Sequence, residues 1–522
     1  MKSFLKTCFL TYWPEVLSFF ATAAASLAVF LLSALRFPND DQFILYRYVD
    51  NIVAGKGFVY NIGEQVLGST TPLFTLVCAA VKYALPFVPT PMLVSCINIL
   101  LLSISAIFFY KLSKLFLSQN FALFAVLIFA LNLSRTIPEG METPLFLLTF
   151  LAFLYYLFTD KLYLSSVLLS LTLLTRPDTG LIAALTALLW WQKVGWRETV
   201  RLTMLCIVVA LPWLLFATWY FGSFVPQSLA TKLHSHDIYR LSPLQGAKIQ
   251  MAALSRIYFG RLFDPDSIPL QVLCNLLPFL GLVALGAWKK LSRNTWILLA
   301  IPVLYFLSFS ISNPIIFPWY LSEMEPLWIL LSIMGVAFIV EKIHTASPGS
   351  VQANRSSLIG VGSVRSVVAG LFLFGIMLGP LLGWARMVTA TDPGSKYGHF
   401  EIAEFIATHQ APGDTVGAGD IGIVGYITGA YIIDFIGLVN SQSVTFYPVK
   451  DACAGQWQFY MTPPKLIEAT QPTWLIAAPS QMEPCFLASP WFTSHYREAY
   501  KNNAQITVWK LNQNVLSKQQ PS

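Results

Sequence analysis

Two adjacent carboxylates, Asp40 and Asp41, follow the first long apolar run of the chain. Ionised groups beside a membrane span are costly unless they stay hydrated or find partners, so their presence here indicates a functional site. A carboxylate within hydrogen-bond reach can take a proton from an attacking hydroxyl, and we predict that Asp40 is such a base. For Asp41 three roles are open: it raises the pKa of its neighbour by like-charge repulsion, holds a hydroxyl, or binds a divalent cation.

Three cations are candidates for stabilising a phosphate on which negative charge develops: Arg47, Arg176 and Lys232. Glu142 and Asp178 lie in short polar segments between apolar runs, and we expect them to position these cations or to bind hydroxyls. Further candidates for substrate positioning are Glu64 and Tyr320.

Most of these assignments have a simpler structural alternative. The two aspartates are also suited to capping a helix. Arg47 is long enough to place its charge at the membrane interface without touching a substrate. Arg176 and Asp178 flank a proline, so a kink with a local ion pair explains them as well.

The same holds for the remaining candidates. Glu142 is also explained as a solvated loop charge, Lys232 as a contact to lipid headgroups, and Tyr320 as part of the interfacial aromatic belt. His234 and His236 lie near Lys232, but on so short a loop we do not predict a metal site.

Composition defines the broad class of the protein. Hydrophobic residues make up 56% of the 522 residues and charged residues 11%, and the mean hydropathy is +0.61. This is far more apolar surface than a soluble core needs, so the chain is predicted to be a polytopic membrane protein. The net charge of +7 is spread over short loops, which favours a role in orientation and excludes nucleic acid as a partner.

Eleven apolar runs are candidates for membrane spans. They cover residues 17–35, 92–110, 119–137, 144–159, 161–175, 180–192, 202–221, 269–288, 295–311, 326–340 and 366–385. A twelfth apolar run covers residues 71–88. If it were a full span, every later segment would lie on the opposite side of the membrane. If this segment only dips into the membrane surface, the basic loops fall on one side together with Lys2 and Lys6, which is the positive-inside pattern.

The polar loops that carry the candidate residues then share the outer side with the tail. Between Phe43 and Val53 apolar residues recur at three- and four-residue steps, which predicts an amphipathic helix along the membrane. Residues 390–522 contain short alternating runs and glycine-rich turns, typical of a small α/β domain. Cys453 and Cys485 are the two cysteines in this tail, and in an oxidising compartment they are candidates for a disulfide.

The segment from Asp40 to Glu64 carries Asp-Asp, Tyr-Arg-Tyr, Gly-Lys-Gly and Asn-Ile-Gly-Glu in this order. It resembles the first outer loop of the GT-C superfamily of membrane glycosyltransferases that use polyprenyl-phosphate sugars, above all the mycobacterial terminal arabinofuranosyltransferases and their bacterial relatives. Further similar segments are residues 140–146, 175–178, 220–232 and 425–438. Residues 68–72 depart from the family pattern, and no basic residue lies beside Tyr320, which leaves the sugar open.

The resemblance implies a helical GT-C membrane domain over residues 1–389, with about eleven spans and outer-face amphipathic helices, followed by a soluble α/β domain over residues 390–522. It implies a multi-pass protein of the bacterial inner membrane whose site and tail face the periplasm. The implied reaction is inverting transfer of a sugar, for example a pentofuranose, from a polyprenyl-phosphate donor to a glycan, glycolipid or protein. No cofactor is required.

Two other classes fit parts of the sequence. A transporter or lipid flippase would share the number of spans, but it should carry charges near the bilayer midplane and two similar halves, which this sequence lacks. A structural or assembly protein with a docking tail would leave the acidic outer loops unexplained.

Overall fold

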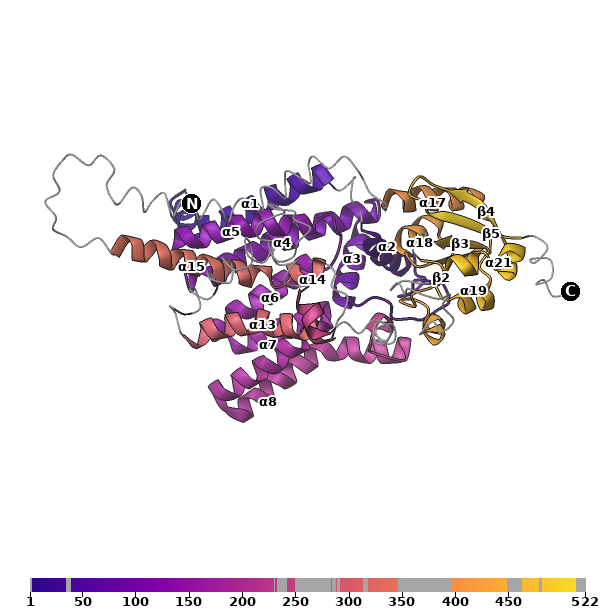
Figure 1. The fold of residues 1–522 in the computed structure, drawn as a ribbon. Coiled ribbons are helices and arrows are strands. Elements are labelled where there is room, and N and C mark those ends of the chain that lie inside the picture. The colour runs from indigo at the N-terminus through magenta and orange to yellow at the C-terminus, as the bar shows by residue number, and fades with distance from the viewer. Residues whose placement is uncertain are drawn as a thin grey trace.

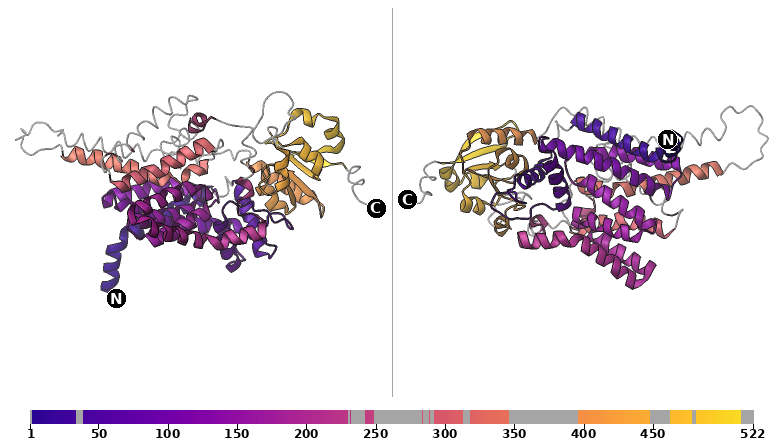
Figure 2. Two further views of the ribbon diagram at one scale, coloured as in Figure 1. Left: turned by 90° about the horizontal axis from the view of Figure 1, so that it is seen from below. Right: turned by 180° about the vertical axis from the view of Figure 1, so that it is seen from behind.

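The computed structural model describes residues 2–33, 39–229, 231, 242–248, 283, 288, 292–312, 318–345, 396–447, 462–477 and 481–512. These residues form a layer of long apolar helices and a smaller α/β unit at one end of it (Figure 1). The N-terminus lies at the opposite end of the helical layer, and the two further views agree (Figure 2). The arrangement therefore separates the N-terminus from the C-terminal domain by the length of the helices.

Long helices build the membrane part. Their bounds are α1 Lys2–Ser33, α4 Thr90–Lys114, α5 Gln119–Leu133, α6 Thr143–Phe158, α7 Leu162–Thr175, α8 Gly180–Phe221, α13 Arg293–Ser312 and α15 Glu325–Thr345. Within the described part of the chain, four stretches are long and apolar enough to cross a membrane: Thr11–Leu32, Thr90–Lys114, Pro177–Phe221 and Asn294–Ile311. The helical membrane architecture is thus confirmed. The number of spans stays a prediction, because the runs 269–288 and 366–385 lie outside the described elements.

Helix α8 contains two predicted runs in one element. At Gly195 the backbone turns to φ 79°, which breaks the helix between residues 180–192 and 202–221. A left-handed φ is accessible to glycine without a Cβ penalty, so the kink occurs where the sequence permits it. Charged side chains gather around this kink: Lys193 pairs with Asp160, and Arg201 with Glu198. This end of the helices lies away from Glu142, which precedes α6.

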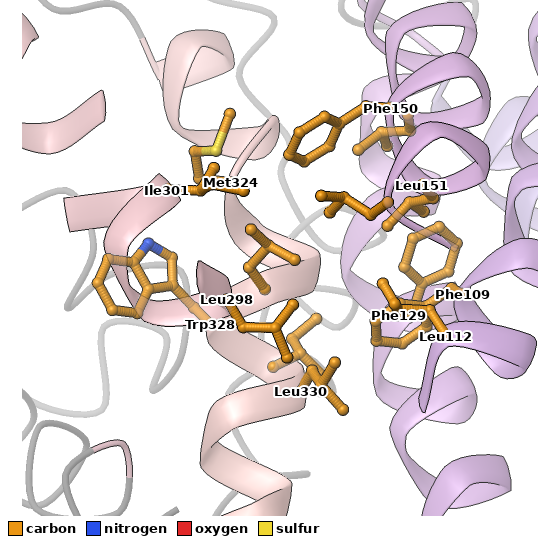
Figure 3. Packing of buried hydrophobic residues seen from close by; sticks show 14 of the residues in the cluster. Phe109, Leu112, Phe129, Phe150, Leu151, Leu298, Ile301, Met324, Trp328 and Leu330 are labelled. Carbon is orange, nitrogen blue, oxygen red and sulfur yellow. The ribbon is translucent and has the colours of Figure 1, made fainter. Parts of the chain in front are cut away.

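An apolar core joins the first helices to the later ones. Phe109 of α4 stacks on Phe129 of α5 with ring centroids 4.9 Å apart. In Figure 3 these rings and Leu151 of α6 lie opposite Leu298 of α13 and Leu330 of α15. Because lipid tails are as apolar as these side chains, such packing stabilises the bundle mainly through close van der Waals contact.

Two short helices lie between the membrane layer and the tail. They are α2, Asp40–Val53, and α3, Pro72–Ala84. At about 1.5 Å per residue, the 13 residues of α3 extend for roughly 20 Å, less than the roughly 30 Å of a hydrocarbon core. Helix α7, with 14 residues, is about as short, so the expectation that the segment 71–88 only dips into the membrane stays a prediction. Gly55, at φ 71°, and Gly57, at φ 96°, follow the end of α2.

The C-terminal domain is a five-stranded sheet with helices around it. The strand order is β2-β1-β3-β5-β4; β1, β2 and β3 are parallel, and β5 is antiparallel to both β3 and β4. The strands are β1 Thr415–Ala418, β2 Tyr431–Asp434, β3 Trp474–Ala477, β4 Tyr496–Lys501 and β5 Thr507–Leu511. The helices are α17 Lys396–His409, α18 Gly422–Thr428, α19 Pro464–Thr470, α20 Pro484–Leu487 and α21 Pro490–His495. The predicted α/β character of the tail is confirmed.

Helix α2 shares a hydrophobic core with this domain. Phe43 and Val49 of α2 belong to the same buried cluster as Ile423 of α18, Val416 of β1 and Trp474 of β3. The outer loop and the tail therefore pack as one body, although more than 340 residues of sequence separate them.

Candidate functional site

Asp40 lies at the N-termini of two helices. It is the first residue of α2, and its carboxylate accepts hydrogen bonds from the backbone N–H groups of Gly422 (2.7 Å) and Ile423 (2.8 Å) at the start of α18. Negative charge at a helix N-terminus is favourable because the helix dipole is positive there. Burial is the main cause that raises the pKa of Asp40, and the nearby Asp420 adds to it. The two backbone amides and His399 oppose this shift. Asp40 thus caps a helix, as the structural alternative proposed, but the helix that it caps is α18 of the C-terminal domain.

Arg47 lies about two helical turns after Asp40 on the same side of α2, and it binds the other end of α18. Its guanidinium donates to the carbonyl oxygens of Gly425 (2.6 Å), Ala430 (2.7 Å) and Tyr60 (2.8 Å). The same group lies 4.3 Å from the centre of the Tyr60 ring, and Arg47 is 7% exposed. A phosphate would have to displace these carbonyl oxygens, so the contacts favour a structural role over the predicted phosphate binding.

The loop after α2 pairs with the edge of the sheet. Asn61 donates through Nδ2 to the carbonyl of Ile432 (2.8 Å) and accepts from its N–H through Oδ1 (3.0 Å), as a neighbouring strand would. Tyr431 donates its hydroxyl hydrogen to Glu64, and Tyr60 donates to the carbonyl of Ile421 (2.6 Å). Glu64, predicted to position substrate, therefore contacts the tail. Tyr60 and Asn61 were missed by the sequence reasoning as contact residues.

A second group of charges lies among the membrane helices around Arg176. This residue forms a two-point contact with Asp178, with Nη2–Oδ2 at 2.7 Å and Nε–Oδ1 at 3.2 Å. Its Nη1 also pairs with Glu142 at 2.9 Å and with Glu323. Tyr305 of α13 donates to Glu323 and to Asp178. The predicted ion pair of Arg176 with Asp178 is one part of this larger network, the Arg176 cluster.

The Arg176 cluster holds more negative than positive charge. Three carboxylates face one guanidinium, and Glu142, Arg176 and Glu323 are all less than 7% exposed. Removing ionised groups from water costs several kcal/mol each, so a surplus of carboxylates is unfavourable unless a proton or ligand compensates it. Burial raises the pKa of Glu323 well above its usual range, and Asp178 and Glu142 add to this effect against Arg176.

Glu323 was missed by the sequence reasoning. Its signal was the pair Glu323 and Glu325 in an otherwise apolar stretch; Glu325 pairs with Arg135 at 2.6 Å. The predicted Tyr320 lies in the short helix α14, Pro318–Ser322, and its ring centre is 5.0 Å from the Arg176 guanidinium carbon. Tyr320 is thus part of the Arg176 cluster and 9% exposed.

Asp41 lies on a different face of α2 from Arg47. Residues at steps of four and three share a helix face, so Asp41 points in the direction of Leu45 and Tyr48. Tyr48 donates to the carbonyl of Val66 and accepts from Gly68 N–H. The loop that Tyr48 contacts carries Leu67, whose carbonyl binds Gln227 N–H at 2.8 Å.

The segment after α8 therefore contacts the same loop, residues 66–68, that Tyr48 of α2 binds. Thr231 donates to the carbonyl of Gly437 at 2.7 Å, and the buried hydroxyl of Ser228 has no hydrogen-bond partner among the described residues. Lys232 is the next residue of this chain segment but lies outside the described residues, as do His234 and His236.

Two further predictions are tested only partly. Cys485 is disulfide-bonded, but its predicted partner Cys453 lies outside the described residues, so the pairing stays a prediction. Over the described ranges, no group of three or more His, Cys, Asp or Glu side chains is arranged to hold a metal ion. A divalent cation at Asp41 stays a prediction as well.

Comparisons with known proteins identify the architecture. The chain has the GT-C membrane fold, as shown by solved structures that match over nearly its whole length. ArnT from Cupriavidus metallidurans bound to undecaprenyl phosphate is 14% identical with a TM-score of 0.55, covering 96% of this chain and 98% of that one. The Archaeoglobus fulgidus oligosaccharyltransferase AglB, in complex with an inhibitory peptide and a dolichol-phosphate, is 11% identical with a TM-score of 0.60, covering 98% and 75%.

The likeness to these structures confirms the expected fold, and no mycobacterial arabinofuranosyltransferase is among these structures. The apo form of the A. fulgidus enzyme matches with a TM-score of 0.57 and 11% identity, over 90% of this chain and 70% of that one. Residues 389–518 match a family model described as a domain of unknown function (DUF8728). No curated protein matches the chain.

Proposed function

We propose that this integral membrane protein is a glycosyltransferase that moves a sugar from a polyprenyl-phosphate donor to a glycan, glycolipid or protein on the outer side of the bacterial inner membrane. The observation that supports it most is the GT-C fold shared with a structure that contains undecaprenyl phosphate, over 96% of the chain. The carboxylates at the start of α2 and around Arg176 supply acid-base groups at the end of the bundle that faces the C-terminal domain.

The proposed reaction is an inverting single displacement. Asp41 takes the proton of the acceptor hydroxyl, whose oxygen forms the new bond to the anomeric carbon while the bond to the donor phosphate breaks. We assign the base to Asp41 rather than to Asp40, because both carboxylate oxygens of Asp40 accept backbone hydrogen bonds from α18. Lys232 is the proposed partner of the departing phosphate. A pentofuranose is the proposed sugar.

Arg176 has a different proposed task from the phosphate binding that the sequence suggested. Because Glu142, Asp178 and Glu323 already surround its guanidinium, we assign it to holding these carboxylates in place. Asp178, whose side chain is 29% exposed, is the member of the Arg176 cluster best placed to reach a sugar hydroxyl. The surplus of acceptor oxygens suits a ligand rich in hydroxyl donors.

The test is direct transfer by the purified, detergent-solubilised protein. It is incubated with a panel of labelled polyprenyl-phosphate pentoses and hexoses and with membrane glycolipid as acceptor, and release of polyprenyl phosphate and labelling of acceptor are both measured. The matched control is Asp41→Asn, which keeps the size of the side chain. Absence of turnover above that control with every donor would reject the function, and energy-dependent movement of lipid without sugar transfer would instead favour a flippase.

The proposed orientation has its own test. Ile62, in the loop after α2, is 59% exposed, and Ser118, between α4 and α5, is also exposed. A cysteine at Ile62 should react with a membrane-impermeant thiol reagent added from the periplasmic side, whereas one at Ser118 should react only after the membrane is opened. The opposite labelling pattern would invert the topology.

A further inference from the structure

We propose that the C-terminal α/β domain is the frame that holds the first outer loop in its reactive position. The contact consists of Asp40, Arg47, Tyr60 and Asn61 on one side and residues 421–432 on the other, and we call it the loop–tail clamp. The proposal gives a role to the domain of unknown function that residues 389–518 match. Its catalytic consequence rests on the proposed function, but the clamp itself does not.

Opposite charges bind the two ends of α18. Asp40 binds the free N–H groups at its first turn, and Arg47 binds the carbonyls of Gly425 and Ala430 toward its last turn. A helix dipole is positive at the N-terminus and negative at the C-terminus, so both charges interact with it favourably. Since both come from α2, the two helices are fixed relative to each other in position and in direction.

Close packing adds to the charge pattern. A Cβ atom at Gly422 would lie 1.8 Å from the carbonyl oxygen of Asp40, and one at Gly425 would lie 1.9 Å from Oη of Tyr60 and 2.7 Å from Nη1 of Arg47. Tyr60 and Arg47 are 1% and 7% exposed and hydrogen-bonded, so they cannot move aside at low cost. At Gly422 the two backbones approach as closely as glycine permits, and at Gly425 two buried side chains approach the helix equally closely.

The clamp acts on Asp41 through its neighbour. Asp40 is fixed to α18 by two hydrogen bonds, and Asp41 follows it in the same helical turn. A reacting group displaced by about 1 Å loses on the order of 100-fold in rate. Asp40, Arg47 and Asn61 are therefore positioning residues, and the tail contributes to transfer without touching the substrate.

The experiment compares two glycine substitutions in the full-length protein. Gly425→Ala inserts a methyl group into the clamp. Gly419→Ala, six residues earlier, is the matched control, because a Cβ there meets only the Gln481 side chain at an ordinary 3.7 Å. Alanine is the better helix former, so without a clamp Gly425→Ala would make α18 more stable rather than less. Hydrogen exchange of residues 40–61 and sugar transfer are both measured.

We expect Gly425→Ala to speed amide exchange across residues 40–61 at least tenfold and to lower transfer at least tenfold, with Gly419→Ala like the wild type. Arg47→Lys, which keeps the charge but loses the forked geometry, should act in the same direction if Gly425→Ala fails to fold. Unchanged exchange in the loop, or a loosened loop with full transfer, overturns the proposal. If the wild type transfers no sugar from any donor, the proposed function fails, while the exchange data still decide whether the clamp exists.

Discussion

Two groups of charged residues, each with one arginine and at least one carboxylate, have different surroundings in the structure. In the loop–tail clamp, Asp40 and Arg47 bind backbone groups of another domain. In the Arg176 cluster, charged side chains bind one another, with three carboxylates to one guanidinium. A charge satisfied by fixed backbone dipoles has little left to offer a ligand, whereas a surplus of carboxylates can respond to one.

This difference separates residues that place the site from residues that can do chemistry in it. Asp40 and Asp41 are adjacent in sequence, yet successive residues of a helix lie on different faces, and only Asp40 accepts the backbone hydrogen bonds of Gly422 and Ile423. The comparison predicts that substitutions in the clamp alter stability and transfer together. Substitutions of reacting groups should alter transfer alone.

The largest effect is expected at Asp41. Asp41→Asn should lower the rate of transfer by roughly 10²–10⁴-fold, since the amide cannot accept a proton. Its melting temperature should stay that of the wild type, as measured by scanning fluorimetry. Asp40→Asn should lower both the rate and the melting temperature. If Asp41→Asn retained normal turnover while Asp40→Asn alone lost it, the base would be Asp40, as the sequence suggested.

The Arg176 cluster should be the most sensitive charged group for folding. Arg176→Gln leaves Glu142, Asp178 and Glu323 without their cation and should cost about 3–5 kcal/mol of stability. Adding Glu142→Gln to this variant removes one of the carboxylates left without a partner and should restore part of the loss. Denaturant unfolding in detergent measures both. Equal stability of the single and double variants would show that the surplus of carboxylates does not destabilise the fold.

A smaller effect is expected where the loop pairs with β2. Asn61→Ala removes two hydrogen bonds to Ile432 and leaves buried backbone groups unpaired, at a cost of about 1–3 kcal/mol. Amide exchange at Ile432 should increase as a result. Ile62→Ala, at the neighbouring exposed position, is the control and should leave this exchange as it is.

The smallest effect concerns pH. Burial raises the pKa of Asp434 to about 6, against backbone hydrogen bonds from Val439 and Gly437 that lower it. A carboxyl with a raised folded pKa contributes stability that is complete below its unfolded pKa, near 4, and is lost as pH rises through about 6. The wild type should therefore lose on the order of 1–3 kcal/mol relative to Asp434→Asn between pH 4 and 6.5. A stability difference constant over this range would exclude the shift.

Sequence patterns predicted the elements better than the contacts between them. The amphipathic period of residues 43–53 depends on local burial, and α2 follows it; the α/β character of residues 390–522 likewise agrees with the strands found there, such as β2. That Arg47 contacts Gly425, 378 residues away, depends on the fold and has no local signal. The sequence likewise marked Arg176 and Asp178, but their contact to Glu323 arises from helix packing.

The glycines at positions 422 and 425 have a consequence for engineered or natural chimaeras. A C-terminal domain exchanged for a homologous one would meet Asp40, Tyr60 and Arg47 at distances that leave no room for an added methyl group. The exchangeable unit is therefore not residues 389–518 alone, but this segment together with residues 40–64. Substitutions at positions 422 and 425 should be inherited together with substitutions in that loop.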